Sequence, residues 1–415
     1  MSNWQQIRLG DVCSFQNGLA FKSNEFDTNG DYYVIKIKEL KNGYVKLFNE
    51  SSKVFKNGKN NIYSIKYNDV LIALTGDPVN KPNPCSWVGR VAVNKNKEQL
   101  YLNQRVAKFC PNDNFLDLKF IYYYFRVYDN FYDLAQKATG SASQANISTK
   151  TIEDTVIFVP SLNKQKQIVK ILSSLDDKIE LNNRINANLE EQAQALFHHW
   201  FVDFEFPNEQ GLPYKSNGGT FVDSELGKIP DGWKVGNLFS VATLFDSKRK
   251  PLSNIQRASR KGEYPYYGAT SVMDYVDDYL FDGTFLLMGE DGSVVNEQGY
   301  PFLQYVTGKF WVNNHSHIMQ GKNGFSTEML YCMMKMTNIS NLVTGAVQAK
   351  LSQTNMNKIL FPLATKDILK YFSIMIEPLY ALLRKNVYEN QTLIQLRDLL
   401  LPKLMSGETI WSINY

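Results

Sequence analysis

The chain has few cysteines and no long apolar run, and both absences exclude classes of protein. Its four cysteines lie far apart among 415 residues, and none forms the C-x-x-C pair of zinc and redox motifs. A run of about 18 apolar residues, which a membrane-spanning helix needs, does not occur. The first residues lack the basic-then-apolar pattern of a secretion signal. We therefore expect a protein of the reducing cytoplasm that does not enter a membrane.

The sequence motifs of catalysis are also missing. An amino-methyltransferase needs an Asn/Asp-Pro-Pro-Tyr/Phe stretch and a Gly-rich cofactor loop, and an ATP-driven motor needs a G-x-x-x-x-G-K-S/T loop. Asn83-Pro84-Cys85 resembles a cytosine methylase nucleophile in those three residues alone. His315 and His317 would share one strand face, but no cluster of acids or cysteines accompanies them in the sequence. We expect no catalytic residue, metal or cofactor in this chain.

What the chain does have is size and local positive charge. A chain of 415 residues is too long for one ordinary core, so two or more domains are expected. The net charge is only +4, yet 15 Lys/Arg stand against 8 Asp/Glu between Lys22 and Lys108. A second basic cluster comprises Lys248, Arg249, Lys250, Arg257, Arg260 and Lys261. Basic surfaces attract phosphate-bearing partners, although a Lys-rich surface that only aids solubility is the alternative.

Three sets of residues occur twice, in the same order along the chain. They are Trp4, Leu9 and Val12 with Trp233, Leu238 and Val241; Thr139, Gly140 and Gln144 with Thr344, Gly345 and Gln348; and Asn182, Asn186, Leu189 and Leu196 with Asn386, Asn390, Leu393 and Leu400. The last set is displaced by 204 positions, and the order is domain, helix, domain, helix. Such a duplication predicts two similar surfaces related by a pseudo-twofold axis, and duplex DNA is the commonest twofold partner.

Two long helices are the clearest elements. In residues 162–200, apolar residues from Ile168 to Trp200 recur alternately four and three apart, which is the period of a coiled coil. A helix of that length would span roughly 58 Å. The second seam runs from Ile368 to Leu404 through Met375 and Leu382, and Pro378 is expected to kink or displace its first turns. Since neither helix can be buried by its own domain, we predict that they pair in antiparallel orientation.

Asparagines interrupt both seams near the middle, at Asn182, Asn186, Asn386 and Asn390. An Asn in a coiled-coil seam costs stability but fixes the register, because misaligned pairing leaves its amide without a partner. We predict that the four asparagines meet across the helix pair. The alternative is that they face solvent at a bulge.

The remaining sequence predicts two mixed α/β domains. Strand patterns occupy residues 32–37, 69–74, 88–93 and 156–159 in the first half, with a helix over 116–134, and residues 281–288, 309–312 and 317–319 in the second half. The predicted fold class is α+β, with two globular α/β domains separated by a long antiparallel two-helix coiled coil in a chain with pseudo-twofold duplication. The expected divisions are 1–160, 161–205 (helix), 206–232 (an irregular Gly/Pro-rich linker), 233–362 and 363–412 (helix).

Three segments resemble one known family and cover the chain in order. They are residues 196–204 (LFHHWFVDF), 223–233 (DSELGKIPDGW) and 396–407 (LRDLLLPKLMSG). On these segments the chain resembles the specificity subunit of a type I DNA restriction–modification system. The resemblance implies two target-recognition domains, each reading half of a split DNA sequence, and paired helices that act as a ruler for the unread spacer.

The same resemblance implies partners and cofactors. Two modification subunits, which carry S-adenosylmethionine and methylate adenine, would bind this scaffold, and restriction subunits with ATP and Mg would join them. Two other functions stay open from the residues alone. One is a degenerate methyltransferase that acts by itself, and the other is a coiled-coil adaptor that joins proteins without DNA.

Candidate DNA contacts follow from chemistry. Lys, Arg and small polar groups contact phosphates, whereas Arg, Lys, Asn, Gln, Ser and Thr can read base edges. The first domain offers Lys22, Ser23, Lys81, Asn83, Arg90, Gln104, Arg105, Ser143 and Gln144; the second offers Lys248, Arg249, Lys250, Arg257, Arg260, Lys261, Tyr266, Tyr267, Asn314, His315 and Gln348. The loops at 140–144 and 345–348 recur, so they cannot encode two different sequences, and we expect them to contact the DNA backbone or brace the helices.

Overall fold

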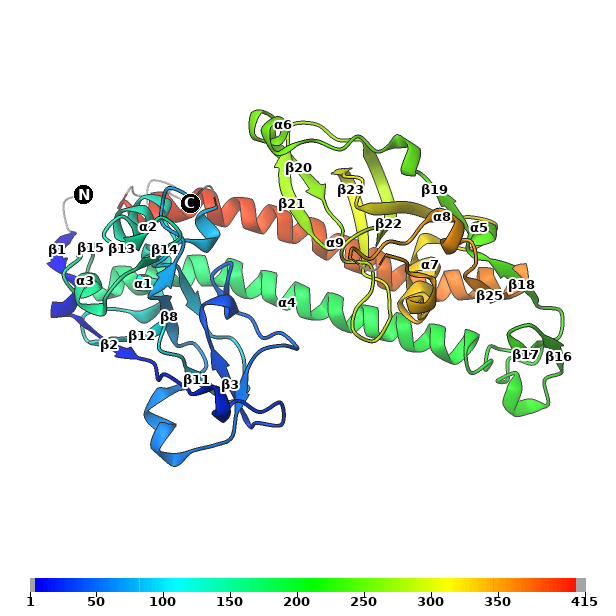
Figure 1. The fold of residues 1–415 in the computed structure, drawn as a ribbon, viewed down its shortest axis with the longest axis horizontal. Coiled ribbons are helices and arrows are strands. Elements are labelled where there is room, and N and C mark those ends of the chain that lie inside the picture. Colours follow the sequence, from blue (N-terminus) through cyan, green and yellow to red (C-terminus); the bar gives the residue numbers. More distant parts are fainter. Residues whose placement is uncertain (1–3, 82, 346, 408–415) are drawn as a thin grey trace, which may run out of the picture. The chain divides into compact units, whose positions relative to one another are not determined.

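The computed structural model describes residues 4–81, 83–345 and 347–407 (Figure 1). Its contacts divide the chain into two compact units, residues 1–179 with 391–415, and residues 180–390. Each unit therefore holds one mixed α/β part and portions of both long helices. Ala346 of the recurring loop and residues 408–412 of the expected last division lie outside the described residues.

Unit 1 is built on a six-stranded sheet with the order β2-β12-β8-β10-β5-β4. The strands are β2 (Cys13–Asn17), β12 (Val106–Pro111), β8 (Val70–Ala73), β10 (Val91–Val93), β5 (Tyr44–Val45) and β4 (Leu40–Lys41). All four residues of β8 are buried, as their unbroken apolar run predicts. A four-stranded sheet lies beside it, with β6 (Lys53–Val54), β3 (Tyr32–Ile35), β11 (Leu100–Leu102) and β7 (Ser64–Ile65).

The helix expected over 116–134 is two helices, α1 (Leu118–Tyr124) and α2 (Tyr128–Ala135). Asp117 caps α1 by accepting hydrogen bonds from the N–H groups of Lys119 and Phe120. At the other end, the Asn130 amide donates to the carbonyl oxygen of Tyr124 at 2.9 Å. That bond supplies a partner to an end carbonyl of α1, so the chain can turn before α2 begins.

Unit 2 repeats the central topology of unit 1. Its six-stranded sheet has the order β19-β24-β22-β23-β20-β21. The strands are β19 (Ala242–Leu244), β24 (Ser316–Gly321), β22 (Phe281–Gly289), β23 (Leu303–Val312), β20 (Lys261–Tyr267) and β21 (Val272–Val276). The antiparallel trio β19-β24-β22 matches β2-β12-β8, and the pair β18 (Lys234–Asn237) with β25 (Leu360–Leu363) matches β1 (Gln5–Arg8) with β15 (Val156–Val159). The predicted duplication is confirmed.

The two long helices are α4 (Leu162–Phe201) and α9 (Lys366–Met405), of 40 residues each. In unit 2, Asn386 Nδ2 donates to Asn186 Oδ1 at 2.8 Å and Asn182 Nδ2 to Asn390 Oδ1 at 2.9 Å. Positions that rise along α4 meet positions that fall along α9, so the helices run antiparallel there. In unit 1 the same sense joins Asp176 to Arg397 at 2.9 Å. The asparagines thus meet, and their role in fixing the register stays a prediction.

The seam of α9 differs from the predicted one by a single position in its first half. Leu369, Ile376 and Leu383 are buried, whereas Met375 and Leu382 are 47% and 43% exposed. Adjacent apolar residues, such as Met375 and Ile376, make both choices compatible with the sequence, and only the partner surface decides between them. Pro378 does not break α9, which is continuous, and it lies on the exposed side of the helix; the kink expected there stays a prediction.

The segment between the halves is ordered, although its composition predicts an irregular linker. Phe206 stacks on Tyr214 at 4.6 Å and on Trp233 at 5.1 Å between ring centroids. Beyond this aromatic stack, β16 (Phe221–Ser224) and β17 (Gly227–Pro230) form a hairpin. The glycines and prolines therefore mark turns within a folded segment. Among the described residues, no helix has the length and apolar character that crossing a membrane demands.

Candidate nucleic-acid interface

In unit 1, four segments meet where β8 ends and β12 begins. The Leu74 N–H donates to the Arg105 carbonyl oxygen, and the Ile147 N–H donates to the Leu74 carbonyl oxygen, both at 2.9 Å. These bonds tie the turn before β12 and the hairpin of β13 (Thr139–Ser141) and β14 (Gln144–Asn146) to the end of β8. The fourth segment follows β2, where a Cβ on Gly18 would lie 2.2 Å from the Asn103 carbonyl oxygen. We call this meeting point the first strand-end site.

Most candidate residues of the first domain lie on segments that begin or end at this site. The exposed ones are Lys22, Ser23, Lys81, Asn83, Gln104, Arg105, Ser143 and Gln144. Arg105 donates to Asn146 Oδ1 at 3.2 Å and to Thr75 Oγ1 at 3.4 Å, so it braces the hairpin against the end of β8. Asn83 accepts from the Cys85 N–H and shapes its own loop.

Arg90 is a structural residue, in contrast to the prediction that it contacts DNA. Its guanidinium donates to the main-chain oxygens of Ile37 at 2.6 Å, Trp87 at 3.1 Å and Leu40 at 3.2 Å. Burial lowers the pKa of Arg90, which is half-buried beneath these loops. With its donors used inside the domain, Arg90 holds the loop at 75–87 in place.

Unit 2 contains the same arrangement of backbone hydrogen bonds. The Glu290 N–H donates to the His315 carbonyl oxygen, and the Leu351 N–H donates to the Glu290 carbonyl oxygen, both at 2.8 Å. His315 therefore corresponds to Arg105, and its ring hydrogen-bonds Asp291, which corresponds to Thr75. We call this the second strand-end site. The correspondence of Arg105 with His315 spans 210 positions, so a search at the 204-residue spacing misses it.

The candidates of the second domain divide into two groups. Lys248, Lys250, Asn314 and Gln348 are exposed, and Asn314 lies in the second strand-end site itself. Arg249 is turned inward, where it donates to the Ser316 carbonyl oxygen at 2.8 Å and pairs with Glu290. Like Arg90, it is a structural residue.

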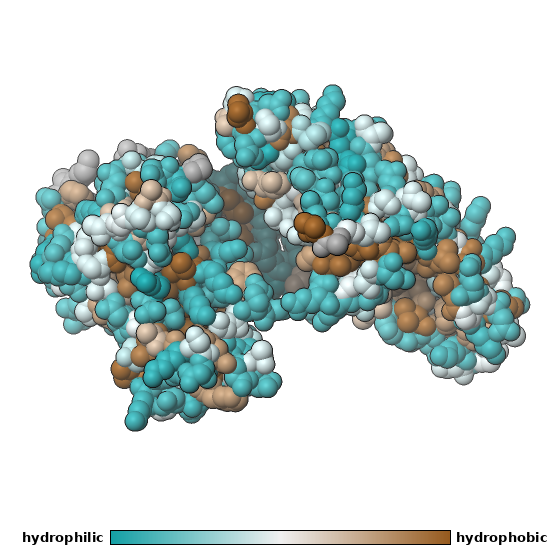
Figure 2. Space-filling model, viewed as in Figure 1, coloured by the Kyte–Doolittle hydropathy of each residue, from teal (hydrophilic) through white to brown (hydrophobic). Residues whose placement is uncertain are grey.

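The rest of the second basic cluster is neutralised by acids on β21 and in the turn after it. Arg257 and Lys261 pair with Asp274, and Arg260 pairs with Asp277 and Asp278. Tyr266 is fully buried and Tyr267 lies half-buried at the end of β20. Around α6 (Asn254–Ser259) the surface in Figure 2 mixes hydrophilic residues with a hydrophobic patch, and Ile255 of α6 is 83% exposed. The six clustered basic residues thus carry much less free charge than their sequence suggests.

The expectation that no acids accompany the two histidines is wrong. Asp246, Glu290 and His317 bring ligand-type atoms within 4.8 Å of one another, with His317 Nδ1 2.6 Å from Asp246 Oδ2. Such a group suggests a cation site. However, Arg249 already supplies a positive charge, 3.6 Å from Asp246 and paired with Glu290, and His317 Nε2 is engaged with the Leu351 carbonyl oxygen at 2.8 Å. We infer that these four side chains form a structural ion-pair cluster, which we call the structural lock, beneath the second strand-end site.

Replacing Asp246 tests that lock. Burial by itself would raise the pKa of the Asp246 carboxyl, but hydrogen bonds from His317 and the Ile318 N–H, with Arg249 nearby, hold the pKa below its usual 3.8. The Asp246 carboxylate therefore contributes its full stabilisation above its ordinary pKa of 3.8. That stabilisation is lost as the pH falls through the lower pKa that the carboxyl has in the folded protein. We expect Asp246→Asn to reduce the free energy of unfolding at pH 7 and the difference to shrink below about pH 4. Urea titrations at both pH values check this, with exposed Asp282→Asn as the control, and a difference independent of pH would contradict it.

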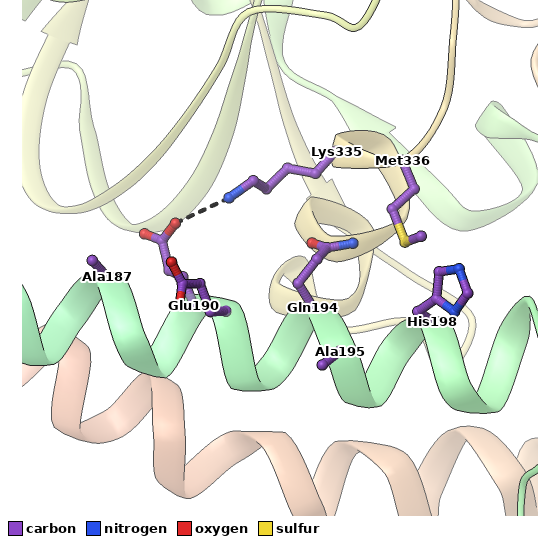
Figure 3. Close-up of a pocket in the computed structure, with 8 residues that line it drawn as sticks. Ala187, Glu190, Gln194, Ala195, His198, Lys335 and Met336 are labelled. Carbon is purple, nitrogen blue, oxygen red and sulfur yellow. Dashed lines mark hydrogen bonds and ion pairs between the residues drawn. The ribbon is translucent and has the colours of Figure 1, made fainter. Parts of the chain in front are cut away.

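A groove of about 480 Å³ lies in unit 2 between α4 and the end of α7 (Thr327–Lys335) (Figure 3). Lys335 Nζ pairs with Glu190 at 3.2 Å across it, and Gln194 donates to the Cys332 carbonyl oxygen at 3.0 Å. His198 and Met336 line the same groove. On α9, Tyr371, Ile374, Met375 and Leu382 share one exposed face, between 43% and 61% exposed.

Comparison with known proteins gives one consistent result. The family model described as type I restriction modification DNA specificity domain matches residues 1–191 and 230–386. The HindI specificity subunit of Haemophilus influenzae is 23% identical over 480 aligned positions, covering 98% of this chain and all of that protein. The MjaIX specificity subunit of Methanocaldococcus jannaschii is 26% identical over 77% of this chain and 75% of its own length.

Two further likenesses agree with these. A putative specificity subunit of H. influenzae, S.HindORF215P, is 36% identical over 147 residues, which are 35% of this chain and 37% of that protein. The crystal structure of the S subunit of a type I restriction-modification system from M. genitalium shares the fold, with a TM-score of 0.52 at 17% identity over 97% of this chain and 96% of that one. Since the family model covers both halves, the chain belongs to the type I restriction modification DNA specificity family.

Proposed function

We propose that this chain is the DNA-recognition subunit of a type I restriction–modification complex, and that each strand-end site reads one half of a split target sequence. The observation that carries the proposal is that one backbone frame occurs in both units with different free side chains at its surface. Two domains that share these backbone hydrogen bonds but present different side chains are suited to recognising two different DNA sequences. The chain would contribute recognition, while its partners contribute catalysis.

The paired helices would fix the length of the unread spacer. Seam asparagines penalise misaligned pairing, because a shifted register leaves buried amides without partners. The contacts of Asn182 with Asn390 and of Asn186 with Asn386 support this role. A helix pair with one permitted register can act as a ruler of fixed length.

The partners we propose are double-stranded DNA, two modification subunits and, through them, restriction subunits. S-adenosylmethionine would lie on the modification subunits and ATP with Mg on the restriction subunits. The exposed apolar face of α9 (Tyr371, Ile374, Met375 and Leu382) and the groove beside α4 are the surfaces that suit helix-to-helix docking of a modification subunit.

The test of the function is reconstitution. The purified chain alone should neither methylate nor cleave DNA, and with its modification subunits it should direct methylation to one split sequence. Methyl transfer by the chain alone, together with S-adenosylmethionine binding at micromolar levels, would favour a methyltransferase that acts by itself. Binding to duplex DNA with a steep salt dependence would count against an adaptor that joins proteins without DNA, because such a dependence reports phosphate contacts that release counterions.

Substituting Ile374 tests the docking face. Ile374→Glu places a charge in the apolar face of α9, where Ile374 is 60% exposed, so we expect at least tenfold weaker binding of the modification subunit. The physical reason is that a buried unpaired charge at an interface costs several kcal/mol, on the order of 2–5. Gln391→Glu adds the same charge elsewhere on α9 and serves as the control. Equal affinities of both variants in pull-down titrations would show that partners dock elsewhere.

A further inference from the structure

Gln104 and Asn314 occupy the same place in the two strand-end sites. Each directly precedes the residue whose carbonyl oxygen accepts the frame hydrogen bond, Arg105 in unit 1 and His315 in unit 2. Each also follows a buried asparagine, Asn103 at 9% and Asn313 at 3% exposed. The equivalence follows from hydrogen bonds rather than from sequence spacing, and it makes residues 104 and 314 comparable position by position.

Both side chains are exposed, and within the described part of the chain neither amide has a hydrogen-bond partner. Their neighbours are engaged: Arg105 bonds Asn146 and Thr75, and His315 bonds Asp291. The backbone of each turn is also fixed, because the Gln104 N–H donates to Leu19 at 2.9 Å and the Asn314 carbonyl oxygen accepts from Arg249 at 3.3 Å. A free amide on a fixed turn is preorganised for a ligand.

The recurring loops provide the contrast. Gln144 and Gln348 are identical, and both follow glycines at positive φ, Gly140 at 146° and Gly345 at 98°. A Cβ at these glycines would lie 2.2 and 2.0 Å from the carbonyl oxygens of Gln144 and Gln348, so the repetition follows from the tight turn. By contrast, Gln104 and Asn314 both carry an amide, but the side chain of Gln104 is longer by one methylene group. Amides of different reach can place their contacts at different base-pair positions in the two halves, whereas the identical glutamines of the recurring loops cannot account for a difference between half-sequences.

Resting on the proposed function, we propose that Gln104 and Asn314 are specificity-determining residues, and that each amide reads the major-groove edge of an adenine in its own half-sequence. An Asn or Gln amide can donate to N7 of adenine and accept from its N6 amino group at the same time. The exposed cations Lys22 and Lys81 in unit 1, and Lys248 and Lys250 in unit 2, lie on adjoining segments and suit the flanking phosphates.

The experiment uses the complete complex and duplexes that carry its split sequence, as obtained from the methylation pattern. Each adenine is replaced in turn by 7-deazaadenine, which lacks the N7 acceptor and keeps base pairing. Wild type should lose at least about fivefold in affinity at one adenine in each half, because 7-deazaadenine removes one of the two hydrogen bonds of a bidentate contact. Gln104→Ala should remove that sensitivity in the first half only, and Asn314→Ala in the second half only.

Gln99→Ala is the matched control, since it removes an exposed amide of the same type from a position in unit 1 outside the strand-end site. We expect it to leave both 7-deazaadenine profiles as they are in wild type. Profiles unchanged by Gln104→Ala and Asn314→Ala, or no sensitive adenine in wild type, would overturn the assignment while leaving sequence-specific binding intact. Failure of the wild-type complex to prefer any split sequence would instead overturn the proposed function, and the assignment with it.

Discussion

Asp176→Asn is expected to lower the free energy of unfolding by about 3–5 kcal/mol, the cost of leaving buried charges without their counterion. The Asp176 carboxylate, 8% exposed, receives Arg397 at 2.9 Å and Arg126 at 3.6 Å, and the Tyr123 hydroxyl donates to it at 2.8 Å. Burial beside this carboxylate raises the pKa of the Tyr123 hydroxyl. Removing the Asp176 charge leaves the Arg126 guanidinium without a carboxylate and leaves Arg397 paired only with Asp398, which is 56% exposed.

The neighbouring residue provides the control for that substitution. Asp177 is 55% exposed and pairs with Lys95 at 3.3 Å, so Asp177→Asn should cost less than about 1 kcal/mol. Urea unfolding of both variants, followed by circular dichroism, gives the comparison. If Asp176→Asn lowered the free energy of unfolding as little as Asp177→Asn does, water would be solvating the unpaired arginines. The ionic cluster would then not hold α4, α9 and α1 together.

The duplicated chain does not repeat this ionic cluster. At the 204-residue spacing, Asp176 corresponds to Tyr380 and Arg397 to Ala193, which are 2% and 0% exposed. There the Tyr380 hydroxyl lies 3.3 Å from the Cys332 sulfur within an apolar core. At these equivalent positions the junction is ionic in unit 1 and apolar in unit 2, where the ion pairs lie elsewhere, between Arg384 and Glu328 and between Lys335 and Glu190. We expect the effects of substitutions at Asp176 and Arg397 to depend on pH and salt much more strongly than the effects of substitutions at Tyr380 and Ala193.

Lengthening both helices should lengthen the unread spacer and leave the half-sequences unchanged. A seven-residue insertion between Ile185 and Asn186, matched by one between Asn386 and Val387, preserves the coiled-coil period. At 1.5 Å per residue it adds about 10 Å, close to the rise of three base pairs at 3.4 Å each. The seam then stays in register because both helices grow at the same level, where Asn386 meets Asn186.

Mapping of methylated adenines in cells that express the variant with its modification subunits measures the spacer directly. An insertion in α4 alone is the control, because it leaves the seam asparagines opposite the wrong partners, and it should abolish methylation. If the doubly extended chain still directed methylation to the original spacing, the helices would not be the ruler.

The sequence predicts the elements of this fold better than it predicts their surfaces. The length and period of α4 and α9 are visible because seven-residue repetition over 40 residues has few alternatives. The residues of α9 that face α4 cannot be predicted exactly from the sequence. Met375 and Ile376 are adjacent and both apolar, as are Leu382 and Leu383, so either member of each pair could be the buried one. The strand-end sites lie at ends of predicted strands, yet their correspondence depends on hydrogen bonds at a different spacing from that of the helices.

Charge was the least predictable property of the candidate sites. Arg257, Arg260 and Lys261 form a basic run in sequence, and their acids come from residues 274–278, on β21 and the turn after it. Arg90 and Arg249 cannot be distinguished from DNA-contacting arginines without knowing that main-chain carbonyls or Glu290 surround them. Long-range pairing of this kind has no local signature in the sequence. The unpaired amides of Gln104 and Asn314 can therefore be identified as candidates only when the structure shows which other candidate residues are paired.

The most direct test of the account is exchange of one recognition domain. Residues 233–362 are replaced by the corresponding domain of another specificity subunit with a known target, and methylated adenines are mapped with the modification subunits unchanged. The account predicts that one half of the split sequence becomes that of the donor protein while the other half and the spacer stay the same. An unchanged sequence, or a change in both halves, would contradict it.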